Sequence, residues 1–94
     1  MLIVSFRHKG LERFWKSDDT RGVPAKHVEK LRAMLTAIME AANIREVERY
    51  SGWRLHPLKG DRHRTWGMVL TRNQRVTFVL RGSSVEVVDV EDYH

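Results

Sequence analysis

The chain has 94 residues, no cysteine and a formal net charge of +5 at pH 7. A hydrophobic content of 41% with 31% charged residues is typical of a folded soluble domain and excludes a disordered chain. The length predicts one domain over residues 1–94, and the lack of cysteine excludes disulfides, thiolate metal sites and a cysteine nucleophile.

The N-terminal segment is predicted to form a strand, a short helix and a loop. β-branched and aromatic residues dominate 2–7, which indicates a strand. The apolar run there is too short for a signal peptide or a membrane span, so we expect a cytoplasmic protein without membrane contact. Apolar residues at helical spacing predict a helix over 8–17, and residues 18–23 follow as a loop with a turn at Gly22.

The clearest pattern in the sequence predicts an amphipathic helix from Pro24 to Ala42. Pro24 suits the first turn of a helix, where its missing N–H costs nothing. Apolar residues then recur at alternating steps of three and four, at Val28, Leu31, Leu35, Ile38 and Ala42. We interpret this stripe as core, and we expect residues 44–50 to add a short amphipathic turn.

The C-terminal half is predicted to be mostly strand. Residues 53–62 contain Pro57 and Gly60 and should form an extended loop. Strands joined by links short enough for hairpins are expected over 64–71, 74–81 and 84–91. The order β-α-α-β-β-β predicts an α+β fold, in which two or three N-terminal helices cover one face of a mainly antiparallel sheet of about four strands.

Alternation within 74–81 predicts which side of that sheet stays open. Val76, Phe78 and Leu80 should face the helices. The opposite face should carry Arg75, Thr77, Val79 and Arg81. A face with arginines would be a concave, positively charged floor.

The basic excess is concentrated in residues 53–75. Against the single acid Asp61, this stretch holds Arg54, Lys59, Arg62, Arg64, Arg72 and Arg75. Residues 76–94 carry a net charge of −3. A concentrated basic stretch attracts polyanions such as nucleic acid, although a solvated surface that maintains solubility explains the charge equally well.

Three elements could carry chemistry. One is the end of the chain, Asp92-Tyr93-His94, which in most proteins would be a frayed tail. Another is the loop with His56, Lys59 and Arg62, whose simpler interpretation is a solvated segment. The third is Arg75 in its strand.

If these elements meet on the open face, they form a set of groups that can cleave RNA without a metal. Histidines can take the 2′-OH proton and protonate the leaving 5′-oxygen near neutral pH. Lysine and arginine can stabilise the phosphate charge, and tyrosine can stack on a base or donate its proton. No metal is expected because the histidines lack the spacing and acidic neighbours of a metal site, and no cofactor-binding motif is present.

The motifs in this order resemble those of a known toxin family. Residues 52–61, GWRLHPLKGD, resemble the "LkGd" segment of HigB-type plasmid-maintenance killer proteins of the RelE superfamily. Residues 74–78, QRVTF, resemble their "WRITF" strand, residues 91–94 their closing "DYH", and residues 3–11 their opening. The resemblance spans nearly the whole chain. It departs at Gln74, where the family usually has an aromatic residue, and at the run Arg62-His63-Arg64.

The resemblance implies a microbial-ribonuclease-like fold and the toxin of a type II toxin–antitoxin system. Such a toxin cuts messenger RNA in the ribosomal A site without metal or cofactor, and so arrests growth. Its implied partners are a helix-turn-helix antitoxin, the ribosome and messenger RNA. The implied catalytic residues are His56, Lys59, Arg75, Asp92, Tyr93 and His94. Contacts to RNA or the ribosome are predicted for Arg54, Arg62, Arg64 and Arg72.

Two other functions fit the same fold and charge. ParE-type toxins of this superfamily poison DNA gyrase and cut no RNA. A nucleic-acid-binding module without catalysis is the other alternative, supported by charge alone. The ending Asp-Tyr-His favours the ribonuclease, because a gyrase poison needs no acid–base groups there.

Overall fold

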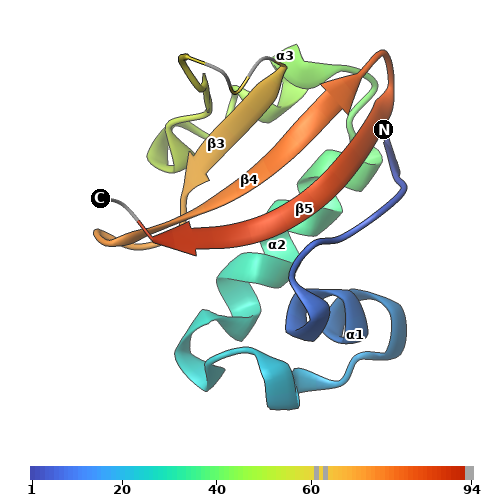
Figure 1. Ribbon diagram of the computed structural model, residues 1–94, viewed down its shortest axis with the longest axis vertical. Helices are drawn as coiled ribbons and strands as arrows, with labels where there is room; N and C mark the ends of the chain where they lie inside the picture. Colours follow the sequence, from blue (N-terminus) through green and yellow to red (C-terminus); the bar gives the residue numbers. More distant parts are fainter. Residues whose placement is uncertain (61, 63, 93–94) are drawn as a thin grey trace.

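The computed structural model describes residues 1–60, 62 and 64–92. Figure 1 shows a curved sheet in front of α2, with α1 below β5 in this view. The strands are β1 (Leu2–Ile3), β2 (His56–Pro57), β3 (Thr65–Val69), β4 (Gln74–Arg81) and β5 (Ser84–Asp92). The helices are α1 (Lys9–Ser17), α2 (Val28–Glu40) and α3 (Ile44–Val47), with 3-10 turns η1 (Thr20–Gly22), η2 (Ala25–His27) and η3 (Ser51–Trp53). The predicted α+β class is confirmed.

The sheet is larger and more mixed than predicted. Within the described residues, five strands pair in the order β1-β5-β4-β3-β2. β1 is parallel to β5, whereas the other neighbours are antiparallel. The strand expected over 2–7 shrinks to Leu2–Ile3 and an isolated parallel bridge between Phe6 and Val88. The loop expected over 53–62 contributes β2, an edge strand that sequence reasoning missed.

α1 begins and ends at local caps. Nδ1 of His8 accepts a hydrogen bond from the Leu11 N–H at 2.9 Å, which satisfies a free donor of the first turn. Asp18 closes the helix in a left-handed conformation with a φ of 54°. A Cβ at Gly10 would lie 2.3 Å from the carbonyl oxygen of Gly22, so the turn predicted at Gly22 packs directly on α1.

The helix predicted from Pro24 to Ala42 is shorter at both ends. Pro24 is extended, with a ψ of 135°, and the 3-10 turn η2 precedes α2. α2 ends at Glu40 because Asn43 caps the next helix and the chain must leave the helical conformation before it. Leu31, Leu35 and Ile38 of the predicted stripe are fully buried, but Ala42 lies beyond the helix and is exposed.

The core lies between α2 and the sheet. Met34 and Ile38 of α2 belong to the same buried cluster as Val76 and Phe78 of β4, and Leu80 packs against it. The predicted orientation of β4 is therefore confirmed on the core side. Among the described residues, no helix combines the length and apolar composition that crossing a bilayer requires.

A bulge in β5 decides which of its side chains face the core. Thr77 pairs with Asp89 and Val79 with Glu86, so two residues of β5 lie opposite Phe78. Val87 carries the bulge with a φ of 53°, and its N–H donates to Oγ of Ser5 at 2.9 Å. The extra residue shifts the alternation, so that Val85 and Val88 are both buried.

Candidate active site

The open face is the side of the sheet that carries Arg75, Thr77, Asp89 and Glu91. These residues are direct register partners, Arg75 opposite Glu91 and Thr77 opposite Asp89, and paired residues point to the same side. Thr77 is buried beneath the other side chains, whereas Arg75 and Glu91 are each 21% exposed at the side chain. The face is therefore built by two neighbouring strands and by the bulge that sets their register.

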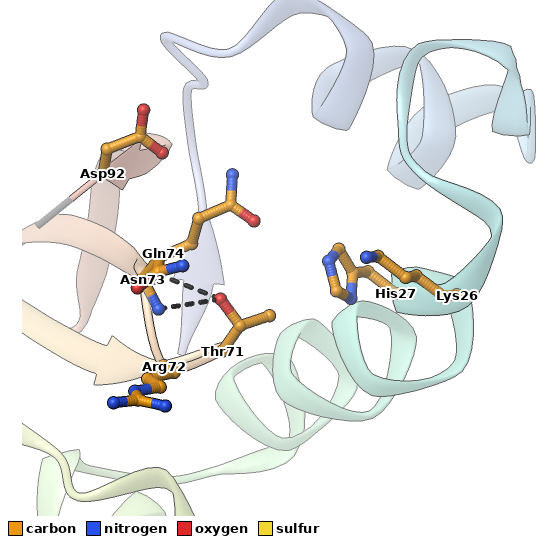
Figure 2. A pocket seen from close by; sticks show the side chains of 7 residues that line it. All are labelled: Lys26, His27, Thr71, Arg72, Asn73, Gln74 and Asp92. Carbon is orange, nitrogen blue, oxygen red and sulfur yellow. Dashed lines mark hydrogen bonds between the residues drawn. The ribbon is translucent and has the colours of Figure 1, made fainter.

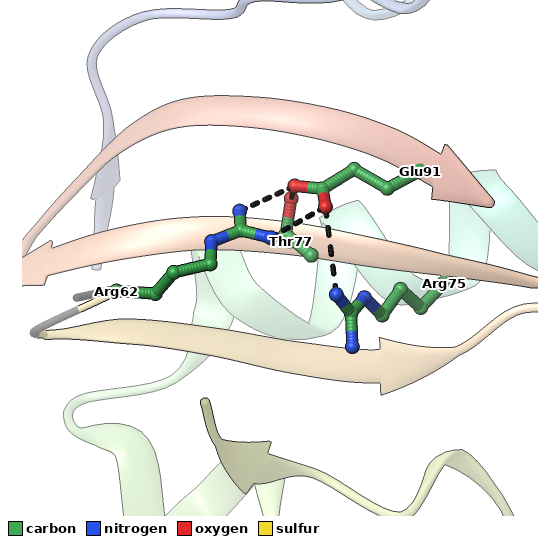
Figure 3. A network of polar contacts seen from close by, with 4 residues as sticks. All are labelled: Arg62, Arg75, Thr77 and Glu91. Carbon is green, nitrogen blue, oxygen red and sulfur yellow. Dashed lines mark hydrogen bonds and ion pairs between the residues drawn. The ribbon is translucent and has the colours of Figure 1, made fainter. Parts of the chain in front are cut away.

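Figure 3 shows a polar network at the centre of the open face, gathered around the Glu91 carboxylate. Arg62 donates from Nη1 and Nη2 to the two Glu91 oxygens at 2.6 and 2.5 Å. The Thr77 hydroxyl donates to Oε2 at 2.5 Å, and Nη2 of Arg75 lies 3.6 Å from Oε1. The hydrogen bonds from Arg62, followed by that from Thr77, lower the pKa of Glu91 from 4.5 to about 2 despite its partial burial.

The prediction that the open face is positively charged is therefore wrong for part of that face. Glu91 and Asp89 bring carboxylates to it. Beside the network is a hollow of about 250 Å³, lined by Arg7, Arg62, Thr65, Thr77, Phe78, Val79, Val87, Asp89 and Glu91. Sequence reasoning missed Glu91 because its neighbour across the sheet depends on the register between β4 and β5.

His56 lies in the edge strand β2, in register with Gly67 of β3. Its Nδ1 is 2.8 Å from the carbonyl oxygen of Arg54. A carbonyl only accepts, so this hydrogen bond places the proton on Nδ1 and leaves the lone pair of the neutral ring on Nε2. Arg54 presents that carbonyl from a left-handed conformation with a φ of 49°.

The register brings His56 to the same face as Arg75. Gly67 pairs with both His56 and Thr77, so the three residues form one row across β2, β3 and β4. Two strand spacings separate the Cα atoms of His56 and Thr77 by about 10 Å. Arg75 projects two residues further along β4.

Other predicted site residues lie at different ends of the sheet. Lys59 is exposed in the loop after β2, and the ladder continues beside it through the hydrogen bond from Leu58 N to Thr65 O at 2.8 Å. Asp92 pairs with Gln74 at the opposite end of β4. Lys59 and Asp92 are therefore not brought together. Tyr93 and His94 lie outside the described residues, so the roles of all these residues remain predictions.

Asp92 lies at a cleft of about 650 Å³ between η2 and the β3–β4 turn, which Figure 2 shows. The cleft is lined by Lys26, His27, Thr71, Arg72, Asn73, Gln74 and Asp92. Oγ1 of Thr71 accepts hydrogen bonds from the Asn73 and Gln74 N–H groups at 3.2 and 3.0 Å, which shapes the turn. Lys26 and His27 could not be found from local sequence, because more than 40 residues separate them from the turn.

The arginines predicted to contact RNA do not share one environment. Arg54 and Arg72 line a cleft of about 320 Å³ with Gly52, Val69 and Thr71. Val69 pairs with Arg75, so this cleft adjoins Arg75 on the open face. Arg64 is exposed just before β3, at the other end of the sheet. Arg62 is engaged by Glu91.

The structure offers little for a metal ion within its described part. No group of three or more His, Cys, Asp or Glu residues there has the geometry of a metal site. The donor set on the open face combines arginines, a histidine and a carboxylate that already accepts three hydrogen bonds. Such groups can bind an anion, and the histidine can exchange a proton.

Solved structures with a similar fold are bacterial toxins. A YoeB/ParE toxin from Agrobacterium tumefaciens superposes with a TM-score of 0.59 and 22% identity, with both chains covered completely. YafQ from E. coli strain BL21(DE3) superposes with a TM-score of 0.57 and 12% identity, over 96% of this chain and 90% of that one. At these identities the likeness confirms the predicted RelE-like fold and says nothing of activity.

The sequence itself identifies the family. Residues 4–94 match the model of the HigB-like toxins, described as RelE-like toxins of the type II toxin–antitoxin system HigB. The chain is also 40% identical over 93 residues to the Endoribonuclease HigB of Proteus vulgaris, covering 99% of this chain and all of the relative. The chain therefore belongs to the HigB-like family of type II toxins.

Proposed function

We propose that the protein is a ribosome-dependent endoribonuclease, which cuts messenger RNA in the ribosomal A site and so inhibits translation and growth. The observation that carries the proposal is the placement of His56 on the same face as Arg75. A group that exchanges protons and a cation that binds phosphate lie on one face of the sheet, on strands separated only by β3. The name of the relative from Proteus vulgaris supports the same activity.

The proposed reaction is attack of a ribose 2′-oxygen on the adjacent phosphorus. The 2′-oxygen–phosphorus bond forms as the bond to the 5′-oxygen breaks. Nε2 of His56 accepts the 2′-OH proton, since its lone pair is held toward the open face by the bond from Nδ1 to Arg54. Asp92 is the alternative base that the sequence leaves open, although it lies beside Gln74 at the end of β4 and next to the cleft with Lys26 and His27. His94 donates a proton to the leaving 5′-oxygen.

Charge on the phosphate is stabilised by Arg75 as a planar fork and by Lys59 as a point charge. Tyr93 stacks on a base or donates its proton. Arg54, Arg64 and Arg72 contact the RNA or ribosomal RNA around the site. Arg62 belongs to the same basic stretch, but its guanidinium is bound to Glu91.

The partners follow from the family and from the reaction. A type II toxin has an antitoxin, and we propose that this antitoxin is a helix-turn-helix protein. The ribosome and its messenger are the proposed targets, in the cytoplasm. The open face is small, so we expect the ribosome to orient the RNA, an effect that can contribute roughly 7–11 kcal/mol to a reaction.

The test adds purified protein to ribosomes translating a defined messenger, followed by sequencing of the messenger ends. We expect cuts within the A-site codon, and no cuts in the same naked messenger at the same protein concentration. Treating the protein with EDTA before addition should leave cleavage unchanged, and this order spares the magnesium that ribosomes need. Inhibition of gyrase without RNA cuts would identify a ParE-type poison. RNA binding without either activity would identify a binding module.

A further inference from the structure

Glu91 has no part in the proposed reaction, yet it connects two segments that do. Figure 3 shows its carboxylate between Arg75 of β4 and Arg62 of the loop before β3. Arg62 lies in the stretch between β2 and β3, of which the structure describes residues 58–60, 62 and 64. The contact from Arg62 to Glu91 joins residues 29 apart in the sequence. Backbone hydrogen bonds from Thr65 N to the Arg62 oxygen and from Leu80 N to the Arg64 oxygen already tie this stretch to the sheet, so what Glu91 adds is a fixed place for the Arg62 and Arg75 side chains.

The geometry of the contact differs from that of an ordinary surface ion pair. Arg62 binds the carboxylate with two parallel hydrogen bonds, and the buried Thr77 hydroxyl adds a third from the sheet below. Bidentate, charge-assisted contacts of this kind fix direction as well as distance. By contrast, Arg81 and Glu86 on the same two strands share one contact of 3.0 Å, with the Arg81 side chain 59% exposed.

Removing Glu91 would leave like charges together. Arg62 and Arg75 lie on opposite sides of one carboxylate, so that carboxylate screens two guanidinium groups from each other. Without it, their repulsion would push the two guanidinium groups apart. Arg75 would then lose its contact with Glu91, and its guanidinium would shift on the open face.

We propose that Glu91 is a positioning residue, whose carboxylate, fixed by Arg62 and Thr77, holds the Arg75 guanidinium at a defined place on the open face. The inference rests on the proposed ribonuclease function. Its carboxyl has a pKa of about 2, so it stays charged near neutral pH and is not the base that takes the 2′-OH proton.

The test compares Glu91→Gln with the matched control Glu86→Gln, which removes a carboxylate of the same strand outside the network. Steady-state cleavage is measured with messenger-programmed ribosomes as substrate, across a range of pH. For Glu91→Gln we expect kcat to fall about 10- to 100-fold, the effect of displacing a catalytic group by roughly an ångström. KM and the shape of the pH profile should remain those of the wild type, and Glu86→Gln should retain wild-type kcat.

Three results would overturn the inference. Equal kcat for Glu91→Gln and Glu86→Gln would make Glu91 a bystander. A rise in KM alone would make the network part of RNA binding. Loss of the acidic limb of the pH profile would make Glu91 itself a proton acceptor.

A second variant keeps the inference testable if Glu91→Gln does not fold. Arg62→Gln removes the bidentate partner that orients the Glu91 carboxylate, and the Arg62 side chain is 40% exposed and tolerates change. It should also lower kcat without raising KM, and a change in KM alone would again overturn the inference. Wild-type protein that cuts no messenger would refute the proposed function itself. Wild-type cleavage with unaffected variants would refute only the role of Glu91.

Discussion

His56 stands opposite Gly67 across β2 and β3, and its imidazole lies directly beside the position that a Gly67 Cβ would occupy. A Cβ at Gly67 would lie 3.4 Å from Cε1 of His56 and 3.2 Å from Cδ2 of Leu58. The contact with Leu58 is tighter than ordinary packing, so Leu58 would have to give way, whereas the contact with His56 is of ordinary length. The place of β2, which carries the proposed base just before Leu58, therefore depends on a glycine in the neighbouring strand.

Gly67→Ala should therefore impair cleavage more than it impairs folding. We expect a loss of roughly tenfold in rate, because the displaced Leu58 shifts β2 and His56 with it, and a stability cost of about 1 kcal/mol from overpacking. Rates are measured on programmed ribosomes and stability by urea unfolding. In a His56→Ala background the same substitution should have no further effect on rate. An additional loss there would mean that Gly67 acts on something other than His56.

Val87→Gly should stabilise the protein. A β-branched residue at a φ of 53° is strained by about 1–3 kcal/mol, which exceeds the entropic cost of a glycine. We expect the free energy of unfolding to rise by about 1 kcal/mol, measured by urea denaturation. Val79→Gly, at a β4 position beside the bulge that has no positive φ, should instead destabilise. A loss of stability for Val87→Gly would show that the side chain contributes more by packing than it costs in strain.

Arg75→Ala and Lys59→Ala should each slow cleavage by roughly 10²–10³, as expected when one donor to a developing charge is lost. Both variants should remain folded, because Lys59 is exposed and Glu91 keeps Arg62 as a partner when Arg75 is removed. Circular dichroism and thermal unfolding provide the check. Unfolding of Arg75→Ala would make that residue structural rather than catalytic.

The Glu91 network should make stability depend on pH in the acid range. The folded pKa of about 2 lies below the ordinary value of 4.5, so the stabilisation is complete above the ordinary pKa and is lost as pH falls toward 2. Glu91→Gln should consequently be less stable than the wild type at neutral pH. The difference should stay constant down to about pH 5 and then close, as urea titrations at successive pH values would show. A difference that widens on acidification would contradict this sign.

Deleting His94 should abolish toxicity while leaving the protein folded. The residues of the buried cluster run from Phe6 to Val88, so the deletion removes none of them. Loss of a general acid costs about 10²–10⁴ in rate. The 93-residue protein is expressed without antitoxin, growth is followed, and folding is checked by circular dichroism. Folded protein that still arrests growth would remove His94 from the proposed mechanism.

Local patterns in the sequence were enough to predict β4 and the buried face of α2. Alternation predicted β4 over 74–81 with its core side chains, and the 3.6-residue period predicted the buried stripe of α2. The ends of the helices were predicted less well than their buried faces. α2 stops at Glu40, before the predicted end at Ala42. The motifs, taken in order, also indicated the family, because a short sequence motif can be recognised without knowing the fold.

The arrangement of the candidate site was decided only by the tertiary structure. Glu91 meets Arg62 and Arg75 because the bulge at Val87 shifts β5 by one residue against β4, and no local period encodes such a shift. The parallel pairing of β1 with β5 brings the first and the last strand together, and a contact between residues so far apart in the sequence has no local signal. Lys26 reaches the cleft at Asp92 through packing of α2 against the sheet. Register and long-range packing depend on the whole core, so the sequence determined the groups available for chemistry and the fold determined which of them meet.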